Sequence, residues 1–153
     1  MGEFQIENGC LKKYTGTDAE AAVPEGITHI GEKAFDECRN LVRVSLPESV
    51  TSIGRGAFYQ CSRLEKIVLP EGLEKIEKEL FGYCRALTSI TIPGRVARIE
   101  KGAFSGCDHL KDIVIPDSVK EIDPASAVGR VIDAILVVQN MRFGRASPRA
   151  GAA

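Results

Sequence analysis

The chain repeats itself at a fixed interval of 23 residues, and this repeat constrains the fold more than any other feature. Four residue types keep the same place in successive units: a proline, a phenylalanine, a cysteine and a leucine. They stand at Pro24, Pro47, Pro70, Pro93 and Pro116; Phe35, Phe58, Phe81 and Phe104; Cys38, Cys61, Cys84 and Cys107; and Leu41, Leu64, Leu87 and Leu110. Chance does not hold four residue types in register over four periods. Because one short unit cannot bury its apolar side alone, the repeat predicts a stack of coils in which each covers the next.

The second unit shows how the 23 residues are divided. Residues 46–49 predict a turn, because Pro47 fixes φ and lacks a backbone donor. The β-branched run 50–53 predicts a short strand on the second side of the coil, and residues 54–60 suit one or two helical turns. The run 64–69 is predicted as a half-buried strand, since its apolar positions alternate at the end. Stacked copies would place these strands in a parallel sheet, with about 4.8 Å between coils.

The same register predicts which side chains face the core. We expect parallel inner strands near residues 42–46, 65–69, 88–92 and 111–115. Their inward side chains should form one stacked column of Val44, Ile67, Ile90 and Ile113. A period between 20 and 29 residues with strands of this type is typical of leucine-rich repeats. The predicted fold class is therefore α/β: a leucine-rich-repeat solenoid, a parallel-strand horseshoe with short helical turns.

The unit resembles the repeat of one subgroup, the BspA-like leucine-rich repeats. Their approximate pattern L-P-x-x-V-x-x-I-x-x-x-A-F-x-x-C-x-x-L-x-x-I-x appears here as Leu46-Pro47, Val50, Ile53, Ala57-Phe58, Cys61, Leu64 and Ile67. The resemblance covers about residues 4–122, and it implies a surface protein that adheres to host or matrix proteins. One departure concerns a glycine column: Gly31 and Gly54 are replaced by Glu77, Glu100 and Asp123. That position therefore cannot require a backbone conformation open only to glycine.

The N-terminal 22 residues are predicted to cap the solenoid, which would occupy residues 23–122. Two short runs, 4–7 and 10–14, flank Asn8-Gly9, the strongest short signal for a two-residue hairpin turn. A hairpin here would cover the open face of the first coil. Residues 15–22 would then link it to the first repeat.

The repeat fails near the C-terminus. Ala127, Arg130 and Asp133 stand where the phenylalanine, cysteine and leucine belong. Residues 123–140 are therefore predicted to form a C-terminal cap or association segment, in which Val131–Val138 is apolar enough to cover the last coil. Its β-branched residues favour a strand, whereas Pro124 suits a first helical turn, and we lean towards helix. If the segment does not fold back, it would form a homodimer contact. Residues 141–153 are predicted to be disordered.

Composition excludes several classes of function. The net charge is −1, which provides no electrostatic attraction to nucleic acid. The most apolar run is far shorter than the roughly 20 residues that span a bilayer, so no membrane insertion is expected. We see no basic and apolar signal peptide at the N-terminus. The family resemblance suggests a cell-surface or secreted protein, whereas free thiols and the missing signal suggest an intracellular protein or a piece of a longer one.

We expect the cysteines to be buried thiols that fill the same niche in every coil. Disulfides between neighbouring coils are a second interpretation, because the Cα atoms would lie within bonding range. A zinc site is a weaker one, since a ladder spreads its ligands along a line. Cys107-Asp108-His109 resembles a nucleophile beside a base, but repeat position accounts for both Cys107 and His109. We therefore predict no enzyme, no catalytic residues, no cofactor and no metal site.

Function is then expected on the solenoid surface. The outward side chains of the inner strands are the candidate ligand-binding face: Arg43, Ser45, Lys66, Val68, Ser89, Thr91, Asp112 and Val114. The first column runs from basic Arg43 to acidic Asp112, which could orient a charged partner. An adjoining column holds Val42, Glu65, Thr88 and Lys111. The leading hypothesis is a non-enzymatic protein-binding module for adhesion or protein–protein interaction. The alternative is a structural repeat protein that self-associates through its C-terminal apolar segment.

Overall fold

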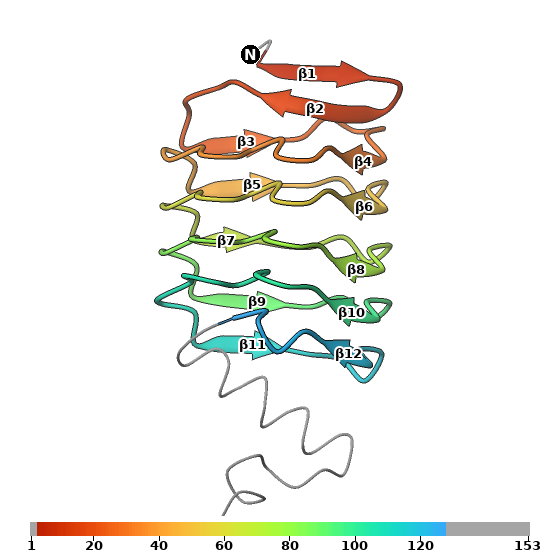
Figure 1. Cartoon of the computed structure of the whole chain (residues 1–153). Coiled ribbons are helices and arrows are strands. Elements are labelled where there is room, and N and C mark those ends of the chain that lie inside the picture. Colours follow the sequence, from red (N-terminus) through yellow and green to blue (C-terminus); the bar gives the residue numbers. More distant parts are fainter. Residues whose placement is uncertain (1–2, 128–153) are drawn as a thin grey trace, which may run out of the picture.

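The computed structural model describes residues 3–127, which form a stack of coils beneath an N-terminal hairpin (Figure 1). The strands are β1 Phe4–Glu7, β2 Cys10–Tyr14, β3 Glu20–Ala22, β4 His29–Ile30, β5 Arg43–Ser45, β6 Ser52–Ile53, β7 Lys66–Ile67, β8 Lys75–Ile76, β9 Ser89–Thr91, β10 Arg98–Ile99, β11 Asp112–Val114 and β12 Glu121–Ile122. Each coil contributes one strand to each of two ladders. The first ladder consists of the sheet β3-β5-β7 followed by the pair β9-β11. The second consists of β4-β6, continuous with the β1-β2 hairpin, followed by the sheet β8-β10-β12.

The register of the first ladder confirms the predicted core column. Val44 lies opposite Ile67 in parallel pairing, and Ile90 lies opposite Ile113. Val44, Ile67 and Ile90 are buried, while Ile113 is partly buried and packs against the same core. A strand pointing one side chain inward between two outward ones produces this pattern.

A row of stacked rings runs through the core parallel to the ladders. Phe35, Phe58, Phe81 and Phe104 are fully buried, and successive ring centroids lie 5.0, 5.7 and 5.8 Å apart. Tyr14 of the hairpin continues the row, with its centroid 5.1 Å from that of Phe35. Burial of four such rings in one column supplies much of the apolar surface that holds adjacent coils together.

The predicted hairpin cap is confirmed. β1 and β2 pair antiparallel, and Asn8 and Gly9 take the two positive φ values, 51° and 77°, that a type I′ turn requires. β2 then pairs parallel with β4, so the hairpin covers the first coil. The segment expected to be a link instead contains β3, which pairs parallel with β5.

The predicted helical turns are wrong: residues 3–127 contain no helix. The stretch 54–61 and its equivalents, 31–38, 77–84 and 100–107, are successive turns, here called the turn arc. Alternate backbone N–H groups bond within the coil or across to the next one, as in Ala57 N–H to Gly54 at 3.2 Å and Phe58 N–H to Leu80 at 3.1 Å. Left-handed residues at two positions of each arc, such as Lys33 and Glu79, make this alternation possible. Bonding to the neighbouring coil thus replaces the i to i−4 bonds of a helix.

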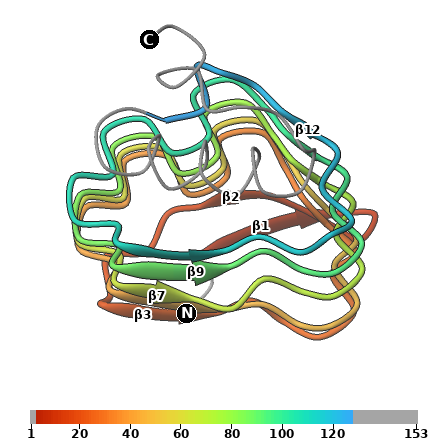
Figure 2. The same ribbon diagram turned by 90° about the horizontal axis from the view of Figure 1, so that it is seen from below.

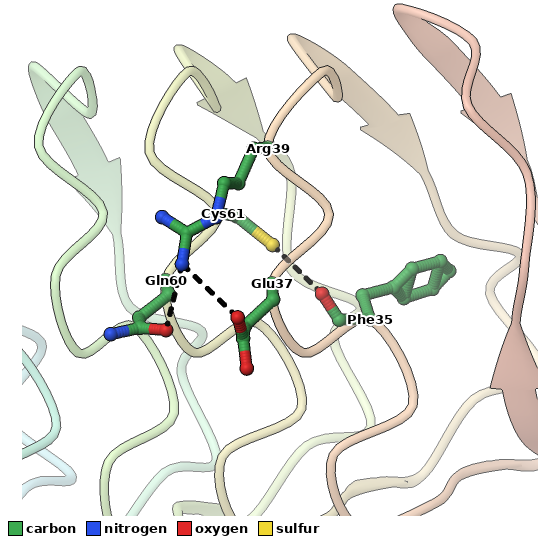
Figure 3. A network of polar contacts seen from close by, with 5 residues as sticks. All are labelled: Phe35, Glu37, Arg39, Gln60 and Cys61. Atoms are coloured by element: carbon green, nitrogen blue, oxygen red, sulfur yellow. Dashed lines mark hydrogen bonds and ion pairs between the residues drawn. The ribbon is translucent and has the colours of Figure 1, made fainter.

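The cysteine column lies against this arc. All five cysteines are free thiols, and Cys61, Cys84 and Cys107 are buried. The Cys61 thiol donates to the Phe35 carbonyl of the preceding coil at 3.1 Å, as Figure 3 shows. Cys84 and Cys107 make the equivalent bond at the same distance to Phe58 and Phe81. The interpretation of the cysteines as core thiols is confirmed for these three, while Cys38 is only partly buried.

The fifth unit begins in the repeat frame. Gly102 N–H donates to the Ala125 carbonyl at 2.8 Å, and Phe104 N–H donates to that of Ser126 at 2.6 Å. Ala127, at the place of the missing phenylalanine, is buried. The predictions for the rest of 123–140, including the homodimer contact through Val131–Val138, and for the tail 141–153 concern residues outside the described part of the chain.

Candidate binding surfaces

Cys107 and His109 are held by different partners. The Cys107 thiol faces the Phe81 carbonyl inside the core, and burial raises its pKa to about 12. The imidazole Nδ1 of His109 lies 2.8 Å from the Arg85 carbonyl oxygen on the surface. The thiol is therefore kept neutral and directed away from solvent, which is the opposite of what a nucleophile requires.

The part of the chain described by the structure holds no group of three or more His, Cys, Asp or Glu side chains able to bind a metal ion. Across the same residues, no helix has the length and apolar character needed to cross a bilayer.

The eight candidate residues lie together on the outward face of the first ladder, here called the ladder face. All eight side chains are exposed. Parallel pairing sets Arg43 beside Lys66, Ser89 beside Asp112, and Thr91 beside Val114. The adjoining column follows the same order, because Glu65 N–H donates to the Val42 carbonyl at 2.9 Å and Lys111 N–H to that of Thr88 at 3.0 Å. The strands hold these side chains at fixed spacing.

The ladder face is hollowed over β3, β5 and β7. A groove of about 530 Å³ is lined there by Glu20, Ala21, Ala22, Arg43, Val44, Ser45, Lys66, Ile67 and Val68. Small side chains at Ala22 and Ser45 leave the space, and Val68 stands beside them with 79% of its surface exposed. Val114 in the same column is 57% exposed. Val68 and Val114 are the two most exposed large apolar side chains of residues 3–127.

Charge on the ladder face is partly paired. Arg43 lies 3.3 Å from the Glu20 carboxylate on the neighbouring strand, with both side chains more than half exposed. Such a solvated pair contributes little stability. Lys66 makes no ion pair with any residue between 3 and 127, so its charge is available to a partner.

A second surface, not predicted from the sequence, lies on the turn arc across the coil from β7 and β9 (Figure 2). We call it the turn-arc groove; it holds about 540 Å³ and is lined by Arg55, Tyr59, Lys78, Glu79, Gly82, Tyr83, Lys101, Gly102, Ser105 and Ala125. One signal was present in the sequence: basic residues recur at the 23-residue interval as Arg55, Lys78 and Lys101. The two tyrosines occupy different repeat positions, so periodicity alone could not bring them together.

The comparisons with known proteins agree with this architecture. A model of the BspA type leucine-rich repeat region matches six copies across residues 5–127. The chain belongs to the BspA-type leucine-rich repeat family. Members of the wider leucine-rich repeat class are generally protein-binding modules rather than enzymes.

Solved structures of other leucine-rich repeat proteins superimpose on this BspA-type chain. A leucine-rich repeat protein of T. pallidum is 37% identical, with a TM-score of 0.73, and the match covers 78% of this chain and 61% of that one. A leucine-rich cell surface protein of Faecalibacterium prausnitzii is 32% identical, with a TM-score of 0.70, and the match covers 82% and 37%. The chain thus spans less than two thirds of the length of each of these two proteins. The pneumococcal vaccine antigen PcpA, at 24% identity and a TM-score of 0.64, shares the fold. No curated protein matches the chain.

Proposed function

We propose that this BspA-type chain is a non-enzymatic protein-binding module that contacts its partner through the ladder face. The observation that carries the proposal is the groove over β3, β5 and β7, which exposed Val68 lines together with charged side chains such as Arg43 and Lys66. An apolar centre bordered by charge is the usual anatomy of a protein contact. Because the strands of the ladder are already ordered, binding does not incur the entropic cost of ordering a flexible surface.

The partner class follows from the same face and from the relatives. The first column runs from acidic Glu20 through basic Arg43 and Lys66 to acidic Asp112, so the face favours a protein that presents acidic groups to the basic centre. One structural relative is described as a cell surface protein. We infer a role in adhesion at the cell surface, with a host or matrix protein as the partner.

We predict that Lys66→Glu combined with Val68→Ser lowers affinity for a captured matrix protein by about tenfold or more, because it removes both the free charge and the apolar centre. Thermal stability should change little, since both side chains are exposed. Arg43 is left intact, because a carboxylate there would face Glu20. The measurement is surface plasmon resonance against a panel of purified extracellular-matrix proteins.

The matched control for this test changes the same residue types on the hairpin. Lys12→Glu with Ile6→Ser removes one exposed lysine and one exposed apolar side chain away from the ladder face. It should leave affinity unchanged. Equal loss in both double variants would rule out the ladder face as the contact surface.

Self-association is the second candidate, and the partly buried Ile113 in the last described strand of the first ladder favours it. Ile67 and Ile90 in the preceding coils are buried, whereas Ile113 belongs to the last strand of this ladder within residues 3–127. A covering segment or a second chain would bury this edge.

Truncation tests the covering role that the sequence predicts for residues 131–138. We expect deletion of residues 131–153 to cause aggregation or marked destabilisation, because the apolar end of the last coil would be left open. Deletion of 143–153 alone should do neither. Light scattering and thermal unfolding of both chains provide the measurement. A monomeric, equally stable chain ending at Arg130 would refute the covering role.

A further inference from the structure

The turn-arc groove carries a row of basic side chains on consecutive coils. Arg55, Lys78 and Lys101 occupy equivalent positions and all line the groove. Backbone bonds from coil to coil keep them adjacent: Gly56 N–H donates to the Lys78 carbonyl, and Glu79 N–H to that of Lys101, both at 3.0 Å. Since coils repeat at the strand spacing of about 4.8 Å, the three charges form an evenly spaced line along the solenoid.

Most of this charge is unneutralised. The Arg55 guanidinium lies 3.3 Å from the Glu79 carboxylate, which is the one acidic side chain in the lining. Neither Lys78 nor Lys101 makes an ion pair with another residue of the described range. Three basic groups against one carboxylate leave an excess of two positive charges in the groove. A ligand with several anionic groups would neutralise this excess positive charge.

Two tyrosine rings form the apolar wall of the same groove. Tyr59 and Tyr83 meet edge to face with centroids 5.6 Å apart. Each ring lies where the next coil has a glycine: a Cβ on Gly82 would come within 2.8 Å of the Tyr59 ring, and one on Gly106 within 2.5 Å of the Tyr83 ring. The glycines therefore make room for the rings, and Tyr83 remains 39% exposed. The rings stand at 89° to each other, and the Arg85 guanidinium lies 5.6 Å from the Tyr83 centroid. They form an angled apolar wall, and each ring carries a hydroxyl at its edge.

The backbone of the groove favours a ligand rich in acceptors. The carbonyls of Arg55, Lys78 and Lys101 already accept bonds from Lys33, Gly56 and Glu79. The N–H groups of the same three basic residues donate to no acceptor within residues 3–127. The backbone of these three residues therefore has N–H groups without a partner in this range but carbonyls that are already bonded, whereas an added peptide strand needs both in alternation. Anionic groups on a non-peptide backbone suit it better.

From these features we propose that the turn-arc groove binds an acidic oligosaccharide. Its carboxylate or sulfate groups contact the row of Arg55, Lys78 and Lys101, and the aliphatic faces of its rings pack against Tyr59 and Tyr83. The volume of about 540 Å³ lies within the range of about 300–1,000 Å³ that is usual for small ligand sites. This site lies across the coil from the ladder face, so it can act without the protein partner proposed above.

Calorimetric titration of the full chain with four six-unit probes tests the proposal. The probes are a hexagalacturonide, which carries carboxylates; a heparin-derived hexasaccharide, which carries sulfates; maltohexaose, which is uncharged; and a hexaglutamate peptide. We expect at least one acidic sugar to bind about tenfold more tightly than maltohexaose and hexaglutamate, because only it offers both anions and ring faces. Its affinity should fall as salt is added.

Variants distinguish binding in the turn-arc groove from non-specific electrostatic attraction of the acidic sugar to lysines elsewhere on the chain. Lys78→Gln with Lys101→Gln should weaken binding of the acidic sugar by about tenfold or more. The matched control, Lys12→Gln with Lys120→Gln, removes two exposed lysines outside the groove and should change affinity by less than about twofold. Tyr83→Ser should weaken sugar binding while leaving any hexaglutamate binding unchanged, which distinguishes ring packing from charge.

Several results would overturn the proposal. Equal or tighter binding of hexaglutamate would assign the groove to an acidic peptide, and equal binding of maltohexaose would show that the charges are not used. Undiminished binding by the Lys78 and Lys101 double variant would place the sugar elsewhere. Absence of saturable binding for both acidic sugars would show that the groove is not a site for acidic oligosaccharides.

Discussion

Alkaline pH is expected to destabilise this protein steeply, because three buried thiols must stay neutral for the chain to fold. Burial raises the pKa of Cys107 to about 12, and it also raises the pKa values of Cys61 and Cys84. Thiols in the unfolded chain ionise near a pKa of about 8.5. Between these limits the native state holds protons that the unfolded state has lost, so its stability falls as the pH rises.

The size of this effect follows from proton linkage. Each thiol should lower the free energy of unfolding by about 1.4 kcal/mol per pH unit above about pH 9.5, or about 4 kcal/mol per unit for all three. The stability contribution is complete below about pH 8 and is lost progressively towards the native pKa values. Urea unfolding at a series of pH values up to 10.5, under reducing conditions, measures the slope.

A cysteine variant isolates the thiols from other groups that titrate in the same range. Cys84→Ala removes the central thiol and should reduce the pH slope by about one thiol's share, or 1.4 kcal/mol per unit, while tyrosines and lysines titrate equally in both proteins. The slope, rather than the absolute stability, is the quantity compared, because the substitution also leaves a small cavity. Identical slopes in the two proteins would mean that the thiols ionise without unfolding.

Phe58→Ala should cost about 3–5 kcal/mol of folding free energy, since it deletes a fully buried ring from the middle of the aromatic row. Phe58 contacts rings on both sides, with centroids 5.0 Å and 5.7 Å away. The loss is a large part of the roughly 5–15 kcal/mol that stabilises a typical domain. Denaturant unfolding of the variant and of the intact chain provides the measurement.

Phe4→Ala is the control at the end of the same row. Phe4 is partly buried, and its ring centroid lies 5.1 Å from that of Tyr14 in the hairpin. Its truncation should cost clearly less, because less apolar surface is exposed to water. If Phe4→Ala destabilised the chain as much as Phe58→Ala, burial of the rings in the row would not be what stabilises the packing of the coils.

The repeat made it possible to predict the ladders and which of their side chains point into the core. A column such as Val44, Ile67 and Ile90 combines strand alternation with a fixed period, and both signals agree on the inward side. The same alternation placed Arg43, Lys66 and the other candidate residues on the exposed face. β3 was not predicted because its unit departs from the repeat pattern. Asp18 stands where later units have leucine, and Ala21 stands where they have valine or isoleucine.

The turn arc could not be predicted from local propensity. Ala57 and Phe58 suit a helix, but the deciding bonds run to Leu80 and other residues one coil away. Gly54 shows a related limit. Its φ is not left-handed, in agreement with the glutamates at equivalent positions, yet a Cβ there would lie 2.6 Å from the Glu32 nitrogen. Gly54 is therefore required by the close approach of the neighbouring coil and not by its backbone dihedral angles. The periodicity of the sequence does not reveal how closely two coils approach at one position.

The alternation of bonds along the turn arc has a mechanical consequence. Each described coil is fastened to the next by its own separate set of hydrogen bonds, and Cys61, Cys84 and Cys107 each add a thiol bonded to a carbonyl of the preceding coil. Tension applied between the chain ends therefore detaches the outermost coil first and leaves the others intact. Each detached unit of 23 residues releases roughly 80 Å of extended chain. A molecule tethered at one end while holding a partner on its side could thus lengthen in steps under load, with the remaining coils still folded.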